Sequence, residues 1–150
     1  VANGKSEQAS LECVLACVKA LARARKDLTC LDNGYLIIAE YMKNLSLSGQ
    51  PGLGDAFMKW VFDNQANPAH CETVAITRTA DDFENFAEFP DDPELALFDF
   101  SDRKFVAVAL CSEHSPSVLN AVDSDWAHAS EALERNGVKI EFLCGRESIR

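Results

Sequence analysis

The segment SDRKFVAVALCSE, from Ser101 to Glu113, decides the fold class of this chain. Serine is a common N-cap, and the apolar residues that follow Ser101 occupy most faces of a helix, so the segment predicts a helix that enters the core. The chain then reaches Val118–Val122, a short apolar stretch that predicts a buried strand. A buried helix that leads into a buried strand is typical of an α/β domain.

The same alternation continues in both directions from this segment. Before it, we expect helices over Ser6–Arg25 (with Ser6 as N-cap), Tyr35–Leu47 and Gly54–Asp63, strands over Leu28–Leu31 and Glu72–Thr77, and an acidic connection over Asp81–Pro93. After it, we expect a helix over Trp126–Asn136 and a strand over Val138–Leu143. Parallel strands need crossover helices, so the pattern predicts one domain over residues 1–150, with a three-layer α/β/α fold and a mainly parallel central sheet.

The charge of the chain narrows the functions that it can have. Its 150 residues are 47% hydrophobic and carry a formal net charge of -10. One sizeable core is therefore expected, without the general basic face that gives non-specific affinity for nucleic acid. The chain also lacks a signal-peptide start and any run of about 18 apolar residues, which predicts a cytoplasmic protein without membrane contact.

The cysteines and histidines do not follow the spacing of a known site. Six cysteines, at positions 13, 17, 30, 71, 111 and 144, lie in apolar stretches, which predicts reduced, buried thiols. Cys13 and Cys17 share one helix face, but no second Cys/His pair follows at zinc-like spacing, so no structural zinc is predicted. The three histidines, His70, His114 and His128, have no paired nucleophile at a recognisable spacing.

Four acidic residues are the candidates for a functional site. Asp102 stands at a helix start, Asp123 and Asp125 follow the strand Val118–Val122, and Glu40 lies on the helix Tyr35–Leu47. Carboxylates gathered at the carboxyl edge of a sheet repel one another, and a Mg²⁺ or Mn²⁺ ion relieves that repulsion. The plainer interpretation stays open: a helix-dipole contact for Asp102, a turn at Asp123 and Asp125, and a solvated charge at Glu40.

Three motifs resemble the PIN domain superfamily of nucleases: EYMKNL (40–45), FDFSDRKFVAVAL (98–110) and LNAVDSDW (119–126). The resemblance implies a divalent-metal-dependent endoribonuclease that hydrolyses RNA phosphodiester bonds, as a toxin or an RNA-processing effector. It implies that Glu40, Asp102 and Asp123 hold Mg²⁺ or Mn²⁺ and that Asp125 adds charge or a water contact. It also implies an antitoxin-like or other protein partner and a homodimer.

One element of the family pattern is not matched in this sequence. Family members begin with a strand that ends in a metal-binding Asp, and VANG (1–4) looks like the stretch just after it. We therefore expect the first strand and its Asp to be missing, by truncation or by degeneration. The alternative function is a catalytically inactive PIN-like module that binds a protein. Arg103 and Lys104 are either phosphate contacts or, more simply, surface charges and partners of nearby acids.

Overall fold

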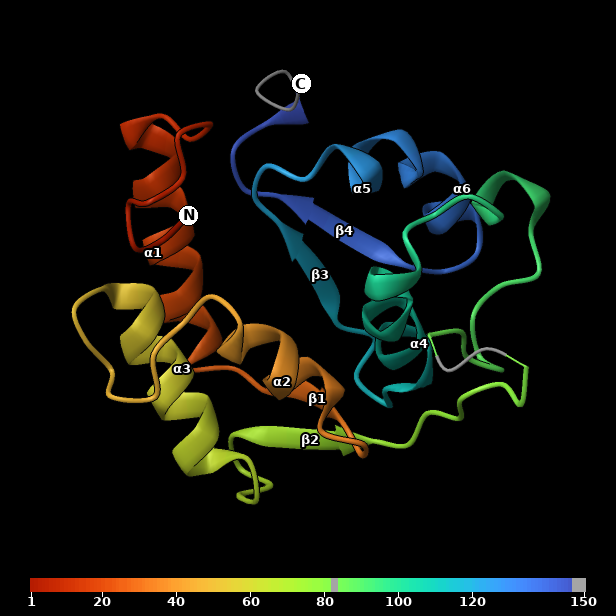
Figure 1. The fold of residues 1–150 in the computed structure, drawn as a ribbon, viewed down its shortest axis with the longest axis horizontal. Helices are drawn as coiled ribbons and strands as arrows, with labels where there is room; N and C mark the ends of the chain where they lie inside the picture. The colour runs from red at the N-terminus through yellow and green to blue at the C-terminus, as the bar shows by residue number, and fades with distance from the viewer. Residues whose placement is uncertain (82–83, 147–150) are drawn as a thin grey trace.

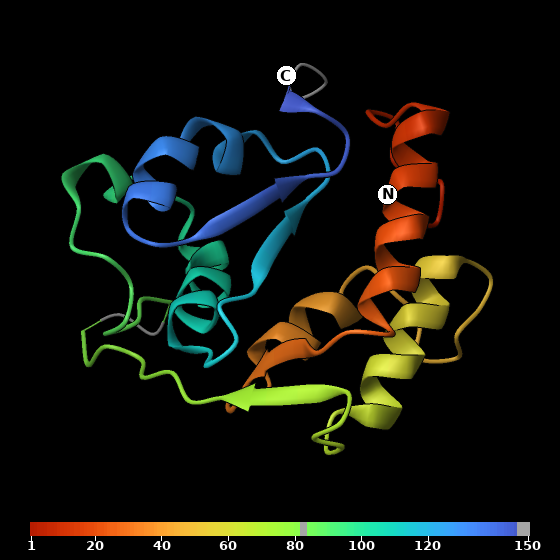
Figure 2. The ribbon, with the colours of Figure 1, turned by 180° about the vertical axis from the view of Figure 1, so that it is seen from behind.

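The computed structural model describes residues 1–81 and 84–146, and it is a mixed α/β fold (Figures 1 and 2). The helices are α1 (Leu11–Ala24), α2 (Leu36–Met42), α3 (Leu53–Asn64), α4 (Arg103–Cys111), α5 (Ser124–His128) and α6 (Ser130–Arg135). The strands are β1 (Thr29–Asp32), β2 (Cys71–Val74), β3 (Ser117–Asn120) and β4 (Lys139–Phe142). Short 3₁₀ helices cover Pro93–Leu95 and Phe100–Asp102. The predicted α/β class is confirmed.

The four strands form two parallel pairs, where one central sheet was expected. β1 pairs with β2, with Thr29 opposite Cys71, and β3 pairs with β4, with Ser117 opposite Lys139. α4 contacts both β1 and β3, so it joins the two pairs (Figure 1). On the other side of the molecule, α1 lies beside α3 in both views of the ribbon.

Each strand pair has its own hydrophobic cluster. The cluster at β1 and β2 contains Leu31, Ile37, Ile38, Phe57, Met58, Val61, Cys71, Val74 and Val108. The cluster at β3 and β4 contains Leu95, Phe98, Val106, Ala109, Trp126, Ala132, Leu133 and Val138. α4 supplies residues to both clusters, because successive side chains point to different sides of a helix. Phe105, also on α4, packs against both.

Capping side chains set several element boundaries. Ser10, not Ser6, caps α1, because its Oγ accepts the amide of Cys13 at 3.2 Å. Asp32, at the end of β1, accepts the amides of Leu36 at 3.0 Å and Ile37 at 2.8 Å, and so starts α2. Such caps stabilise a helix by about 1 kcal/mol each. The buried carboxylate of Asp32 is therefore used within the fold.

Two of the predicted boundaries near the acids were wrong. Ser101 does not cap α4; its own amide donates to Asp99 Oδ1 at 2.8 Å within the 3₁₀ turn that precedes the helix. The helix expected over Trp126–Asn136 is divided into α5 and α6, and it begins earlier, where Asp123 Oδ1 accepts the amide of Asp125 at 2.9 Å. Within the expected connection Asp81–Pro93, residues 82–83 lie outside the described residues.

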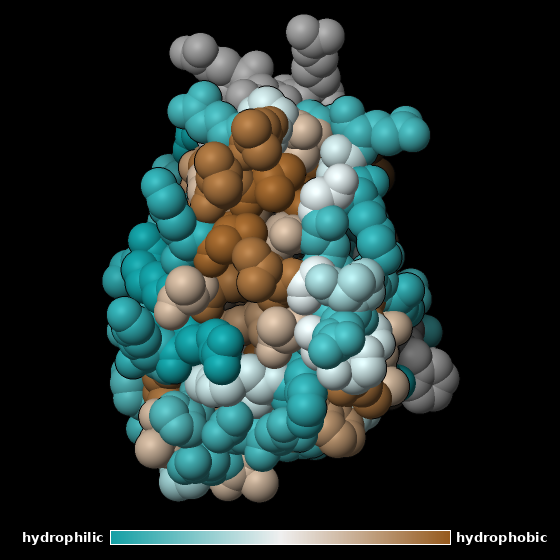
Figure 3. Space-filling model, turned by 90° about the vertical axis from the view of Figure 1, so that its left-hand side faces the viewer, coloured by the Kyte–Doolittle hydropathy of each residue, from teal (hydrophilic) through white to brown (hydrophobic). Residues whose placement is uncertain are grey.

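The outer face of α1 is unusually apolar. Leu11 and Leu15 are 75% and 50% exposed. Figure 3, which views the side of the molecule where α1 and α3 lie, shows a vertical band of apolar side chains. In the described part of the chain, no helix is long and apolar enough to span a bilayer.

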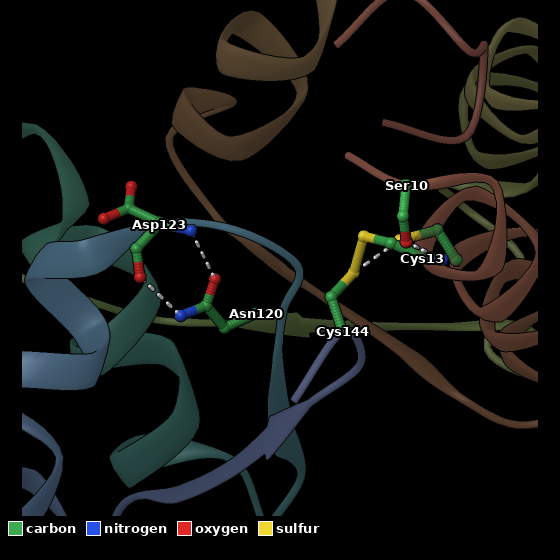
Figure 4. The surroundings of a disulfide bond; sticks show 6 residues. Ser10, Cys13, Asn120, Asp123 and Cys144 are labelled. Carbon is green, nitrogen blue, oxygen red and sulfur yellow. Dashed lines mark hydrogen bonds between the residues drawn. A yellow bond between two sulfur atoms is a disulfide. The ribbon is translucent and has the colours of Figure 1, made fainter. Parts of the chain in front are cut away.

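The prediction that all cysteines are reduced was wrong for one pair. Cys13 on α1 and Cys144, just after β4, form a disulfide with a Cα–Cα distance of 4.7 Å (Figure 4). The two residues are 131 positions apart, so only the tertiary fold brings them together. Cys17 and Cys71 are free and buried, as expected, whereas Cys111 is free and exposed.

Candidate functional site: an apolar groove with two acids

An apolar groove of about 510 Å³ lies between α1, α4 and β3. Its walls include Leu21, Phe105 and Val118. Two of the four predicted acids, Asp102 and Asp123, also line it. A concave apolar site with a few converging polar groups is the usual form of a binding or active site.

Asp102 is the partly buried acid of this groove. Its Oδ2 accepts a hydrogen bond from Trp126 Nε1 at 2.8 Å, which fixes the carboxylate at the start of α4. Burial raises the pKa of Asp102, and the negative charge of Asp123 raises it further. The hydrogen bond from Trp126 lowers this pKa, but the net effect is a raised pKa. The two carboxylates therefore lie within electrostatic reach of each other.

Asp123 is held at the end of β3 by a reciprocal pair of hydrogen bonds with Asn120. The Asp123 amide donates to Asn120 Oδ1 at 3.0 Å, and Asn120 Nδ2 donates to the Asp123 carbonyl at 2.8 Å (Figure 4). The carboxylate of Asp123 is exposed, and one of its oxygens caps α5. A strand end followed by a capped helix thus places this acid on the groove.

Glu40 on α2 is connected to the same region through Lys104. Its Oε2 accepts from Lys43 Nζ at 2.7 Å and from Lys104 Nζ at 3.2 Å, and Lys104 also donates to the carbonyl of Ser101. Burial alone would raise the pKa of Glu40, but the two lysines outweigh it, so this pKa is lowered. Lys104 is thus the partner of a nearby acid, as the plainer interpretation of its position predicted.

The four predicted acids are therefore only partly assembled. Asp102 and Asp123 share the groove, Glu40 is neutralised by lysines, and the Asp125 side chain is exposed on α5. Across residues 1–81 and 84–146, no three acidic side chains have ligand oxygens within 4.8 Å of one another. Among these residues the group whose ligand atoms do lie that close consists of Cys13, Cys17 and Cys144, while Asp102 and Asp123 share the lining of the groove.

Arg103 is buried and does not line the groove, so the expectation of a surface charge was wrong. Only 6% of the residue is exposed. Its guanidinium lies 4.3 Å from the ring centroid of Phe89 and 3.8 Å from that of Phe100. It also donates to the Ala96 carbonyl and to Asn85 Oδ1, both at 3.0 Å. Arg103 therefore holds the connection before α4 against the core.

A second polar cluster, around Glu72 of β2, was not predicted from the sequence. Glu72 Oε2 accepts from Ser112 Oγ at 2.6 Å and from Cys30 Sγ at 3.3 Å, and it lies 3.1 Å from His114 Nδ1. Residues 72 and 112 are 40 positions apart, so no spacing pattern reveals the cluster.

The Glu72 cluster does not form a nucleophilic triad. The hydroxyl of Ser112 donates to the Glu72 carboxylate rather than to His114, and a carboxylate with a pKa lowered to about 2 is too weak a base to activate it. Burial raises the pKa of Cys30 to about 11, which keeps this thiol protonated and weakly nucleophilic near neutral pH. The cluster therefore stabilises the fold.

Glu72→Gln is expected to lower the free energy of unfolding at pH 7 by about 2 to 3 kcal/mol. Burial would raise the pKa of Glu72, but hydrogen bonds from Ser112, the Glu113 amide and His114 lower it from 4.5 to about 2. A depressed pKa stabilises the fold above pH 4.5, and this contribution is lost as the pH falls towards 2.

Urea denaturation of wild type and Glu72→Gln between pH 7 and pH 2 measures this contribution. The gap between the two proteins should close as the pH falls. Glu113→Gln is the matched control, because its side chain is exposed and only its amide contacts Glu72. A gap that stays constant with pH would show that the charge of Glu72 contributes nothing.

Comparison with known proteins does not assign a function to the groove or to the Glu72 cluster. No family model matches this chain, and neither a curated protein nor a solved structure matches it. The candidate site is therefore the apolar groove with Asp102 and Asp123 on its walls.

Proposed function

We propose that this chain is a divalent-metal-dependent endoribonuclease of the PIN type, with Asp102 and Asp123 as its central metal ligands. The observation that carries the proposal is the pair of carboxylates on one groove, where burial and the charge of Asp123 raise the pKa of Asp102. Two acids in electrostatic reach of each other, one of them partly buried, repel, and a bound cation relieves that repulsion.

The donor set of the groove suits Mg²⁺ or Mn²⁺. Hard cations prefer carboxylate oxygens, and Mg²⁺ is commonly bound by only one or two carboxylates, with waters and substrate phosphates completing its shell. Asp102 and Asp123 would supply those two carboxylates, whereas Glu40, paired with Lys104, and Asp125 would act further out. Bound there, the ion would activate a water and stabilise negative charge on a phosphodiester.

The chain's own residues position the acids. Trp126 orients Asp102 through its indole N–H, and Asn120 fixes the backbone of Asp123. Because the chain carries a formal charge of -10, an RNA backbone would be held by the local cation rather than by a basic surface. We extend the proposal to the three-layer PIN-like arrangement of the fold, to a toxin or RNA-processing role, and to a homodimer or an antitoxin-like partner.

Cleavage of a mixed RNA substrate in Mg²⁺ or Mn²⁺ tests this proposal. We expect the wild type to cleave only with the metal present, and Asp123→Asn to lose at least about 100-fold of the rate. Asparagine is as good an N-cap as aspartate, so α5 should survive the change. Asp81→Asn, at an exposed acid outside the groove, is the control. Equal cleavage in a chelator, or by Asp123→Asn, would contradict the proposal.

A second candidate function is a catalytically inactive module that binds a protein. The exposed leucines of α1, Leu11 and Leu15, favour it, because contiguous exposed apolar surface often marks an interaction site (Figure 3). The ion pair of Glu40 with Lys104 also favours it, since it occupies one of the acids. Lack of cleavage by the wild type in either metal would move the assignment to this candidate.

A further inference from the structure

Three cysteine sulfurs meet where α1 passes the end of β4. Cys13 and Cys17 lie one turn apart on α1, and Cys144 follows β4. The Sγ atoms of Cys17 and Cys144 are 4.0 Å apart, and all three sulfurs lie within 4.8 Å of one another. In the structure two of them form the Cys13–Cys144 disulfide (Figure 4).

The disulfide alone accounts for only two of these sulfurs. Cys17 is only 5% exposed, and it is also one of the residues that line the groove. Isolated buried cysteines are common as small apolar residues. Cys17 is not isolated, because its sulfur lies within contact distance of a cysteine pair. The three sulfurs together form a group of soft metal ligands.

We propose that the reduced chain binds a Zn²⁺ ion through the thiolates of Cys13, Cys17 and Cys144. Thiolate sulfur is a preferred ligand of this ion, with Zn–S bonds of about 2.3 Å, so two sulfurs on one tetrahedral ion lie about 3.8 Å apart. The Cys17–Cys144 distance of 4.0 Å is close to that value. The fourth position is left for water, since Cys17 borders the groove.

The disulfide and the ion are mutually exclusive states of the same sulfurs. A dithiol reductant opens the Cys13–Cys144 bond by transferring two hydrogen atoms to the protein sulfurs and closing its own disulfide. Three thiols then lose three protons as the ion binds. Because the ion displaces these protons, affinity should increase with pH.

Metal titration of the full chain, before and after reduction, tests the site. The oxidised and the dithiol-reduced protein are each freed of reductant without air and titrated with Zn²⁺ against a chelating dye, and with Cd²⁺ by its thiolate charge-transfer absorbance. We expect one ion per reduced chain and none at this site in the oxidised chain. Equal binding by the oxidised and reduced forms would overturn the proposal.

Alkylation of the reduced wild type identifies the ligands without any mutation. Bound Zn²⁺ should protect Cys13, Cys17 and Cys144 from a thiol-alkylating reagent, while the exposed Cys111 should react at an unchanged rate. Cys17→Ser should lose at least about tenfold in affinity, and Cys111→Ser should lose none. Protection that includes Cys111 but omits Cys17, or full affinity in Cys17→Ser, would overturn the proposal.

Discussion

Asp102→Asn is expected to abolish metal-dependent RNA cleavage, by at least about 100-fold, and to make the protein more stable at pH 7 by about 0.5 to 1 kcal/mol. Loss of cleavage follows from the proposed ligand role of Asp102. The gain in stability follows from the raised pKa of Asp102, whose charged form is disfavoured by burial and by Asp123. Asparagine keeps an oxygen that can accept the Trp126 indole N–H.

The pH dependence of this gain has a definite sign. A group whose pKa is raised by folding stabilises the fold below its ordinary pKa and loses that contribution as the pH rises. The wild type should therefore fall behind Asp102→Asn as the pH rises from about 3 to 7. Denaturant unfolding at both pH values, beside the cleavage assay, measures the two effects, with Asp81→Asn as the control.

The two readouts of Asp102→Asn separate a functional acid from a structural one. Lost cleavage with raised stability is the signature of an acid kept for its chemistry at a cost in stability. Lost cleavage with a large loss of stability would instead assign Asp102 a structural role, as the anchor of Trp126. An unaltered rate would remove Asp102 from the site altogether.

Arg103→Met is expected to lower the free energy of unfolding by about 3 to 5 kcal/mol. Methionine fills a similar volume but offers no donor to the carbonyl of Ala96 or to Asn85 Oδ1. It also removes the planar cation from between the rings of Phe89 and Phe100. The guanidinium also donates to the buried carbonyls of Phe98 and Leu95, both at 3.4 Å, and buried acceptors that lose a charged donor carry the desolvation cost of that loss.

Two further variants serve as references for the stability loss expected in Arg103→Met. Arg23→Met removes an arginine that pairs with Glu141 on the surface, and its effect on the free energy of unfolding should be small. Arg103→Lys keeps the charge but loses the planar fork, so it should fall between the two. Urea unfolding of all four proteins orders them. If Arg103→Met is no less stable than Arg23→Met, the contacts of Arg103 contribute nothing net.

The sequence predicted those helices whose ends are fixed by contacts between residues close to one another in the chain. The helix expected over Gly54–Asp63 appears as α3, because Asp55 accepts the amide of Gly52 at 2.9 Å within the same turn. The helix expected over Tyr35–Leu47 ends early, at Met42. There the chain turns away so that the Ser46 amide reaches Asp55 at 2.7 Å, a contact with the next helix that no pattern within 35–47 encodes.

The positions of Asp102 and Asp123 next to predicted elements could also be read from local sequence signals. Asp102 immediately precedes α4 and Asp123 lies between the end of β3 and the start of α5, and such positions share one edge of a parallel arrangement. The Glu72 cluster and the Cys13–Cys144 pair could not be found this way. Their members belong to elements that meet only after the chain has folded, and the spacing between them follows from no helical or strand period.

The central place of α4 also determines how this domain comes apart. Six of its nine residues are buried, and both hydrophobic clusters are completed by its side chains. If one strand pair opens and α4 is released, the apolar side chains of α4 that pack against the other pair are exposed as well. The two pairs should therefore unfold together. Although the strands form two pairs, the domain should therefore melt cooperatively, in a single all-or-none transition.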